Sequence, residues 1–122
     1  MDDDPKILYV QTHGIDEASK AATPFYLATA AAAMDMEVSI YFTMHGPTLL
    51  RKDSRDLTVK EGGAPLSSFI DLAVETGVNL LVCQPSLDLN DLAMEDLMDG
   101  VQMIGGAAFN DMAAEADAVI SF

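Results

Sequence analysis

The sequence predicts an α/β fold in which helices cover both faces of a five-stranded, mostly parallel sheet. Five short apolar runs, most of them rich in β-branched residues, alternate along the chain with segments of helical spacing. This order favours parallel pairing of the strands. The 122 residues amount to a single domain, spanning 1–122. Five strands in a chain of this length predict a flavodoxin-like three-layer sandwich.

The five apolar runs are the expected strands. Most are nearly continuous in apolar side chains, as is typical of strands that helices cover on both faces. Because crossovers between parallel strands are right-handed, we expect the first strand to lie between the second and the third. The expected strands are Ile7–Val10, Val38–Phe42, Val78–Val82, Val101–Ile104 and Ala118–Ile120.

Two helices are expected before the third strand. Apolar residues recur at helical spacing over 27–34 and again over 66–73. Each segment follows a proline, Pro24 in the first case and Pro65 in the second. Proline is favoured at the first position of a helix, so both prolines support these helix starts.

Two shorter helices are expected later in the chain. An apolar stripe of methionine and leucine over 94–98 predicts a third helix, with Asn90 as its N-cap and Gly100 at its end. The last helix is expected from about Asn110 to Ala116. The alternation of strand and helix is then complete to the end of the chain.

The charge of the chain excludes two classes of partner. It carries 20 acidic side chains against 6 basic ones, a net charge of −14, and its residues 1–5 form an acidic tail. A surface this acidic repels nucleic acid phosphates and anionic membranes, so we expect neither as a partner. Aspartate outnumbers glutamate 14 to 6. This excess fits a protein from a salt-rich cytoplasm, and equally a protein that is simply acidic.

The sequence indicates a cytoplasmic protein. Cys83 is the only cysteine, so no intrachain disulfide forms and nothing points to an oxidising compartment. The first five residues are acidic where a signal peptide is basic. The longest apolar stretch, Thr23–Met44, carries Asp35 and Glu37 in its middle, which makes it too polar to span a bilayer.

The segment Arg51–Gly63 is the irregular region of the chain. It holds four of the six basic side chains and a local charge of +1, whereas the rest of the chain carries −15. The segment is either a solvated connection of mixed charge or a flap that brings cations over an anionic ligand or a thiolate. In the second case Arg51 and Lys52 are candidate supporting residues.

Both histidines and the cysteine follow expected strands at the point where each strand ends. His13 and Gly14 follow the first strand, His45 and Gly46 the second, and Cys83 the third. Ligands of parallel α/β sheets bind at the carboxyl ends of the strands. We therefore expect a histidine to lie near the cysteine at this edge, and the irregular segment to border the opening.

Cys83 is the candidate nucleophile. It is followed by Gln-Pro-Ser, which indicates a turn where backbone N–H groups favour a thiolate. Ser86 is placed to donate a hydrogen bond to the sulfur, and we expect a shallow cleft to expose it. The alternative is a structural cysteine that packs as a small hydrophobic residue.

Other chemistry is weakly indicated. Two histidines and one cysteine are ligand types of zinc, but no two of them lie at the spacing of a metal motif. Glycine-rich phosphate-binding motifs and the G-x-S-x-G motif are absent from the sequence. We expect no metal and no cofactor, and interpret each histidine more simply as a hydrogen-bonded structural group.

Several stretches of the sequence resemble the DsrE/DsrF-like family. The most specific are the Phe-Thr-x-x-Gly turn at 42–46 with Leu-Leu-Arg-Lys at 49–52, and the Cys-x-x-Ser at 83–86. Relatives usually have methionine at positions 85 and 87 and glycine near 90–91, so we expect the loop after Cys83 to be shaped differently here. The other matching stretches are Lys6–Gly14, Ala22–Ala28, Met36–Val38 and Gly105–Phe122.

This resemblance implies a flavodoxin-like fold and a small cytoplasmic sulfurtransferase subunit. In such a protein Cys83 carries sulfur as a persulfide and passes it to a partner. The implied partners are sulfur donor and acceptor proteins or small sulfane-sulfur species. The implied assembly is a homo-oligomer, which we expect to be a dimer, a trimer or a hexamer.

Two other functions stay open beside sulfur transfer, so enzymatic activity is not settled by the sequence. One is a module that binds a small anion or a nucleotide at the edge with His13, His45 and Cys83, without a covalent step. The other is a structural subunit of an oligomeric complex in which Cys83 is inert. Alkylation and persulfide formation at Cys83 distinguish all three.

Overall fold

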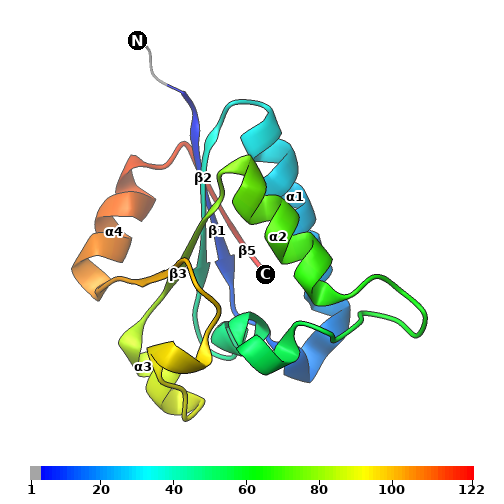
Figure 1. The fold of residues 1–122 in the computed structure, drawn as a ribbon. Helices are drawn as coiled ribbons and strands as arrows, with labels where there is room; N and C mark the ends of the chain where they lie inside the picture. The colour runs from blue at the N-terminus through cyan, green and yellow to red at the C-terminus, as the bar shows by residue number, and fades with distance from the viewer. Residues whose placement is uncertain (1–3) are drawn as a thin grey trace.

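The computed structural model describes residues 4–122 and confirms the predicted fold class (Figure 1). Five strands form one sheet in the order β4-β3-β2-β1-β5, and all four neighbouring pairs are parallel. The strands are β1 (Lys6–Gln11), β2 (Glu37–Phe42), β3 (Asn79–Val82), β4 (Val101–Met103) and β5 (Ala118–Ser121).

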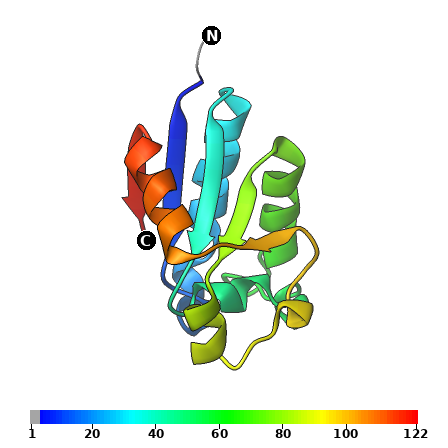
Figure 2. The ribbon, with the colours of Figure 1, turned by 90° about the vertical axis from the view of Figure 1, so that its left-hand side faces the viewer.

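Helices lie on both faces of this sheet, which gives the expected three layers. Helices α1 (Ala22–Ala33) and α2 (Leu66–Thr76) cover one face, and α4 (Gly106–Glu115) lies alone over the other (Figures 1 and 2). The short helix α3 (Gln84–Leu89) follows β3 beyond the carboxyl end of the sheet. Short 3-10 turns complete the chain at Ile15–Lys20, Gly46–Leu50, Lys52–Ser54 and Met94–Asp96.

The expected strand order is wrong, because β2 rather than β1 lies in the middle of the first three strands. The right-handed crossover rule decides on which face a helix lies for a given step, but not the direction of the next step. Here β1, β2 and β3 follow one another in the same direction, so α1 and α2 share a face and contact each other. Buried small residues, among them Ala28, Ala31 and Ala73, allow this close packing.

The helix expected from Asn90 lies earlier in the chain. Helix α3 begins at Gln84, directly after its N-cap Cys83, so the expected turn is the first turn of a helix. Asn90 is the C-cap of this helix rather than the N-cap of the next, because its side chain donates to the carbonyl of Ser86. The following residue, Asp91, has a positive φ of 54° that prevents the helix from continuing.

The two later helices also differ from expectation. The methionine stripe over 94–98 forms only the 3-10 turn Met94–Asp96, which Asp96 closes by accepting the backbone N–H of Ala93. Helix α4 starts at Gly106, earlier than the expected Asn110. Its N-cap is Gly105, and glycine is tolerated at that position though not favoured in helices, which explains why the start was missed.

Two apolar clusters hold the layers together, and they differ in size. The larger lies between the sheet and helices α1 and α2, and includes Phe25, Phe42 and Ile70. The smaller lies on the α4 face, where half-buried side chains from α4 pack on four buried residues of the sheet. Helix α4 contributes no fully buried side chain. The buried members of the smaller cluster are Leu8, Tyr41, Leu81 and Cys83.

The amino-terminal segment and the helices complete the description. Residues 1–3 of the expected acidic tail lie outside the described residues, while Asp4 and Pro5 are exposed. Within residues 4–122, no helix combines the length and the apolar character that crossing a membrane requires.

Candidate functional site

Cys83 lies at the carboxyl edge of the sheet, between the end of β3 and the start of α3. The pairing of Phe42 with Val82 places Thr43 beside it at the end of β2. Only 8% of Cys83 is exposed, and its neighbours in the smaller cluster include Phe109 of α4. The expectation that a shallow cleft exposes the sulfur is therefore not met, because Cys83 is buried among side chains of α4 and the sheet.

A network of hydroxyl groups surrounds the sulfur. Ser86 Oγ lies 2.9 Å from Cys83 Sγ and 3.0 Å from Thr43 Oγ1. The backbone N–H of Met44 donates to the same Ser86 oxygen at 2.9 Å. A serine hydroxyl has one proton and two acceptor sites. If Ser86 accepts from both Met44 and Thr43, its own proton is directed to Cys83.

Tyr41 contributes a third hydroxyl on the same face of the sheet as Cys83. Its ring packs against Phe109 with 4.3 Å between ring centroids, and both belong to the cluster that contains Cys83. Burial, the hydrogen bond to Cys83 and the charge of that group raise the pKa of Tyr41 well above its ordinary value. The Tyr41 hydroxyl therefore keeps its proton and acts as a donor toward the sulfur.

These donors decide the ionisation of Cys83. Burial by itself raises the pKa of the thiol. Hydrogen bonds from the Ser86 and Tyr41 side chains, the Ser86 backbone N–H and the Thr43 side chain outweigh burial and leave the pKa of Cys83 lowered. Donors to a thiolate stabilise the charged form, which is the nucleophile in sulfur chemistry. The site therefore combines a covered sulfur with an enlarged thiolate fraction.

The structure places His13 apart from Cys83. His13 follows β1, which is separated from β3 by β2. Its ring nitrogens contact Thr12 Oγ1 at 3.3 Å and Glu17 Oε2 at 3.3 Å, both near in sequence. The neighbouring Gly14 packs directly against the carbonyl oxygen of His45, and a side chain at this position would collide with it.

His45 lies nearer to the sulfur but reaches it only through other residues. Its Nδ1 lies 3.1 Å from Asn90 Oδ1, and Asn90 donates to the carbonyl of Ser86. The adjacent Gly46 packs against the carbonyl oxygen of Gln11 without room for a side chain. Gly14 and Gly46 thus let the turns after β1 and β2 pass each other closely.

The basic segment Arg51–Gly63 and Cys83 belong to different apolar clusters. The segment runs on the side of the sheet that α1 and α2 cover (Figure 1), and its apolar residues join the larger cluster, whereas Cys83 belongs to the smaller one. Arg51 donates to Asp53 at 2.8 Å, and both line a pocket with Lys52. A supporting role of Arg51 and Lys52 at Cys83 stays a prediction.

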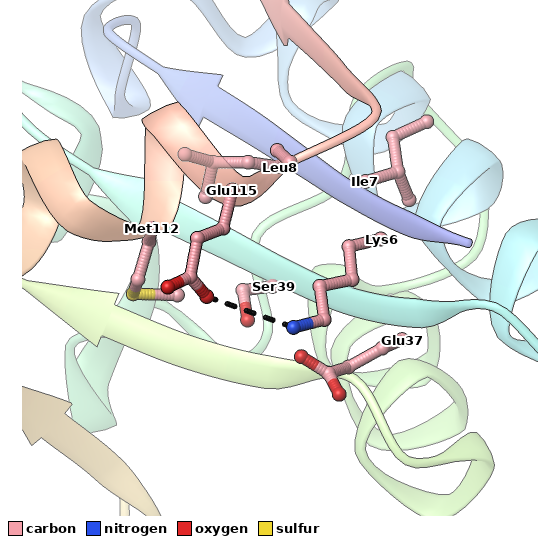
Figure 3. A pocket seen from close by; sticks show the side chains of 8 residues that line it. Lys6, Ile7, Leu8, Glu37, Ser39, Met112 and Glu115 are labelled. Atoms are coloured by element: carbon pink, nitrogen blue, oxygen red, sulfur yellow. Dashed lines mark ion pairs between the residues drawn. The ribbon is translucent and has the colours of Figure 1, made fainter. Parts of the chain in front are cut away.

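A well-defined pocket lies at the opposite, amino end of β1 and β2 (Figure 3). Its volume is about 50 Å³, and Lys6 Nζ contacts Glu115 Oε1 at 3.6 Å across it. The remaining lining residues are Ile7, Leu8, Glu37, Ser39, Met112 and Ala116.

Residues 4–122 contain no group of three or more His, Cys, Asp or Glu side chains placed to hold a metal ion.

Three residues that contact or support the sulfur were not singled out from the sequence. Thr43 carried a usable signal, because it is the first residue after the second strand, as Cys83 is after the third. Tyr41 reads as an ordinary strand residue, and only the register of β2 against β3 places it on the face of Cys83. Asn90 was assigned to the wrong helix.

The comparisons with known proteins agree with this geometry. The DsrE/DsrF-like family matches residues 5–122, which is nearly the whole chain. The chain belongs to this family. Among curated relatives, the sulfur carrier protein DsrE2 of Allochromatium vinosum is 26% identical, over 80% of this chain and 86% of its own length. A role in sulfur relay is supported in general terms by the family and this relative.

Two solved structures of similar length share the fold. The ychN protein of E. coli superposes with a TM-score of 0.79 at 16% identity, covering 97% of this chain and 99% of its own. MTH1491 of Methanobacterium thermoautotrophicum, a protein of unknown function, gives a TM-score of 0.67 at 16% identity, covering 98% and 100%. At these identities the likeness supports the five-stranded α/β architecture alone.

Proposed function

We propose that this protein is a cytoplasmic sulfur carrier in which Cys83 accepts sulfane sulfur as a persulfide and passes it to a partner thiol. The observation that carries the proposal is the hydroxyl network at the end of β3. It places the Ser86 hydroxyl 2.9 Å from the Cys83 sulfur, and its hydrogen bonds lower the pKa of the thiol. The similarity to a sulfur carrier of Allochromatium vinosum supports the same chemistry.

The proposed transfer has two steps and no net oxidation. The Cys83 thiolate attacks the sulfane sulfur of a donor persulfide, the donor S–S bond breaks, and the donor leaves as a thiolate. An acceptor thiolate then attacks the outer sulfur of the Cys83 persulfide. That bond breaks, the acceptor becomes the persulfide, and Cys83 returns as a thiolate. One cysteine suffices, because the second thiol belongs to the partner.

The reducing cytoplasm suits this chemistry, because an oxidising compartment converts free thiols and persulfides to disulfides. Cys83 is the only cysteine of the chain, so its persulfide has no intramolecular thiol that would resolve it. A carrier with one cysteine therefore keeps its sulfur until an external acceptor arrives. We include sulfur donor and acceptor proteins, or small sulfane-sulfur species, in the proposal as its partners.

One observation favours a competing function. Cys83 is 92% buried within an apolar cluster, and buried cysteines commonly serve as packing residues. In that case the protein is a structural subunit whose cysteine is inert. The two functions differ in one measurable property, which is whether the sulfur of the folded protein reacts.

Intact mass spectrometry tests the proposal. The protein is incubated with inorganic polysulfide at neutral pH, and persulfide formation adds steps of about 32 Da to the chain. We expect these steps in the wild type and not in Cys83→Ser, and we expect dithiothreitol to remove them. A folded wild type that gains no mass, and whose Cys83 also resists alkylation, would refute the sulfur carrier and show that Cys83 is inert.

A further inference from the structure

Asn90 joins the two segments that form the sulfur site. Its side-chain Nδ2 donates to the carbonyl of Met44 at 2.7 Å and to the carbonyl of Ser86 at 2.6 Å. Met44 belongs to the turn after β2, whereas Ser86 belongs to α3. The carboxamide thus ties the turn to the helix directly beside the Ser86 hydroxyl.

The hydrogen-bond partners of Asn90 determine which end of its carboxamide is the nitrogen and which is the oxygen. Both protons of Asn90 Nδ2 are used by carbonyl oxygens, so its Oδ1 is available only as an acceptor. His45 Nδ1 lies 3.1 Å from Oδ1 and must therefore carry a proton. A neutral imidazole that makes this contact carries its proton on Nδ1.

Met44 needs such a constraint because its backbone is strained. Its φ is 55°, in the left-handed region that residues other than glycine rarely adopt. In this conformation its N–H points to Ser86 Oγ and its carbonyl receives Asn90. Strained residues persist only where their surroundings hold them, and the two side chains from the α3 segment hold this one.

We propose that Asn90 is a positioning residue for the Cys83 thiolate, acting through Met44 and Ser86. It holds the turn after β2 against α3, so that the N–H of Met44 occupies one acceptor site of Ser86 Oγ. Thr43 fills the second site, and the serine proton is left for the sulfur. The inference rests on the proposed function of Cys83 and adds a residue that does not itself touch the sulfur.

The test is the pH dependence of Cys83 alkylation by iodoacetamide in Asn90→Ala. We expect the alkylation pKa to rise by about 0.5 to 1 unit, which slows the reaction at pH 7 by about three- to tenfold. The rate at high pH, where the thiolate is fully formed, stays within about twofold of the wild type. A purely structural asparagine would lower stability and leave the alkylation pKa unchanged.

Asn79→Ala is the matched control. Asn79 Nδ2 also links β3 to β2, through Val38 O at 3.3 Å and Ser39 Oγ at 3.4 Å, but at the amino end of the strands. Its loss is expected to leave the alkylation pKa unchanged. If Asn90→Ala does not fold, Asn90→Leu replaces it, because leucine has nearly the size of asparagine, adds no charge and loses both donors.

The route through Ser86 is tested by the double variant. Because Asn90 acts through Ser86, the double variant Asn90→Ala with Ser86→Ala is expected to match the alkylation pKa of Ser86→Ala alone. Shifts that simply add would overturn this route, and a wild-type pKa in both Asn90→Ala and Asn90→Leu would overturn the proposal. Alkylation needs no sulfur donor, so a wild type that forms no persulfide would disprove sulfur transfer without touching this result.

Discussion

Replacing Ser86 by alanine is the most direct test of the hydroxyl network. The Ser86 hydroxyl lies 2.9 Å from Cys83 Sγ, and hydrogen bonds to charged groups are worth about 1.5–3 kcal/mol. That range corresponds to about 1 to 2 pKa units. Thr43 Oγ1 lies 3.7 Å from the sulfur and takes over part of the lost interaction. We therefore expect the Cys83 pKa to rise by about one unit, at the lower end of this range.

The assay is the alkylation rate of Cys83 between pH 5 and 10, with folding checked by circular dichroism. Ser86→Ala is expected to react about tenfold more slowly than the wild type at pH 7 and at a similar rate at pH 10. Ser54→Ala is the matched control, because Ser54 is equally buried and donates to Thr48 O away from the sulfur. An unchanged pKa in Ser86→Ala, or a wild-type value of about 8.5 or higher, would refute the reasoning.

The same substitution changes how stability depends on pH. A thiol whose pKa is lowered by folding contributes stability that is fully present above its unfolded pKa of about 8.5. This contribution is lost as the pH falls through the folded pKa. The wild type should therefore gain stability over Ser86→Ala as the pH rises from 6 to 9.5, by about 1.4 kcal/mol for each unit of pKa difference. Urea unfolding at both pH values measures the gain, and Ser54→Ala should show none.

Three further predictions concern the packing of Phe109 over the site, the net charge of the chain and its exposed apolar residues. Phe109→Ala removes the ring that packs on Tyr41, and we expect it to speed alkylation of Cys83 at pH 10 severalfold. An unchanged rate would mean that Phe109 does not limit access of the reagent to the sulfur. The melting temperature should rise between 0.05 and 1 M NaCl, because salt screens repulsion within a chain of net charge −14. Scanning fluorimetry measures the melting temperature, and a value that does not change with salt would contradict the prediction. Light scattering at tens of micromolar should give a dimer or larger, since Val119 and Ile120 on strand β5 are 47% and 39% exposed. Val119→Glu should shift that assembly toward the monomer, whereas a monomeric wild type would contradict self-association.

The fold class was within reach of the sequence because each strand carried its own signal. The runs at β1, β2 and β3 are apolar enough to be recognised without tertiary information, and the alternation with helices indicates a parallel sheet. The order of the strands could not be predicted from the sequence, because the handedness rule constrains each crossover separately. In the observed order α1 and α2 share a face and contact each other, and this contact exists only after folding.

The candidate site was predictable in its nucleophile and not in its environment. Position at a strand end and the Cys-x-x-Ser pattern identify Cys83 and Ser86 from local sequence. Tyr41, Thr43 and Asn90 become neighbours of these two through the pairing of β2 with β3 and the placement of α3. These are long-range relations, and a single sequence carries no periodic signal for them.

For the pKa of Cys83, the chemical type of the hydrogen-bond donors matters as much as the number of donors. The groups that lower its pKa are uncharged hydroxyls and a backbone N–H, held by the fold beside a residue that is 8% exposed. Donors fixed in a buried site need no reorganisation when the thiolate forms, and salt does not screen them as it screens surface charges. In a chain of net charge −14, these uncharged donors stabilise an anion at Cys83. The alkylation pKa of Cys83 should therefore change little between low and high salt, while the stability of the whole protein responds strongly.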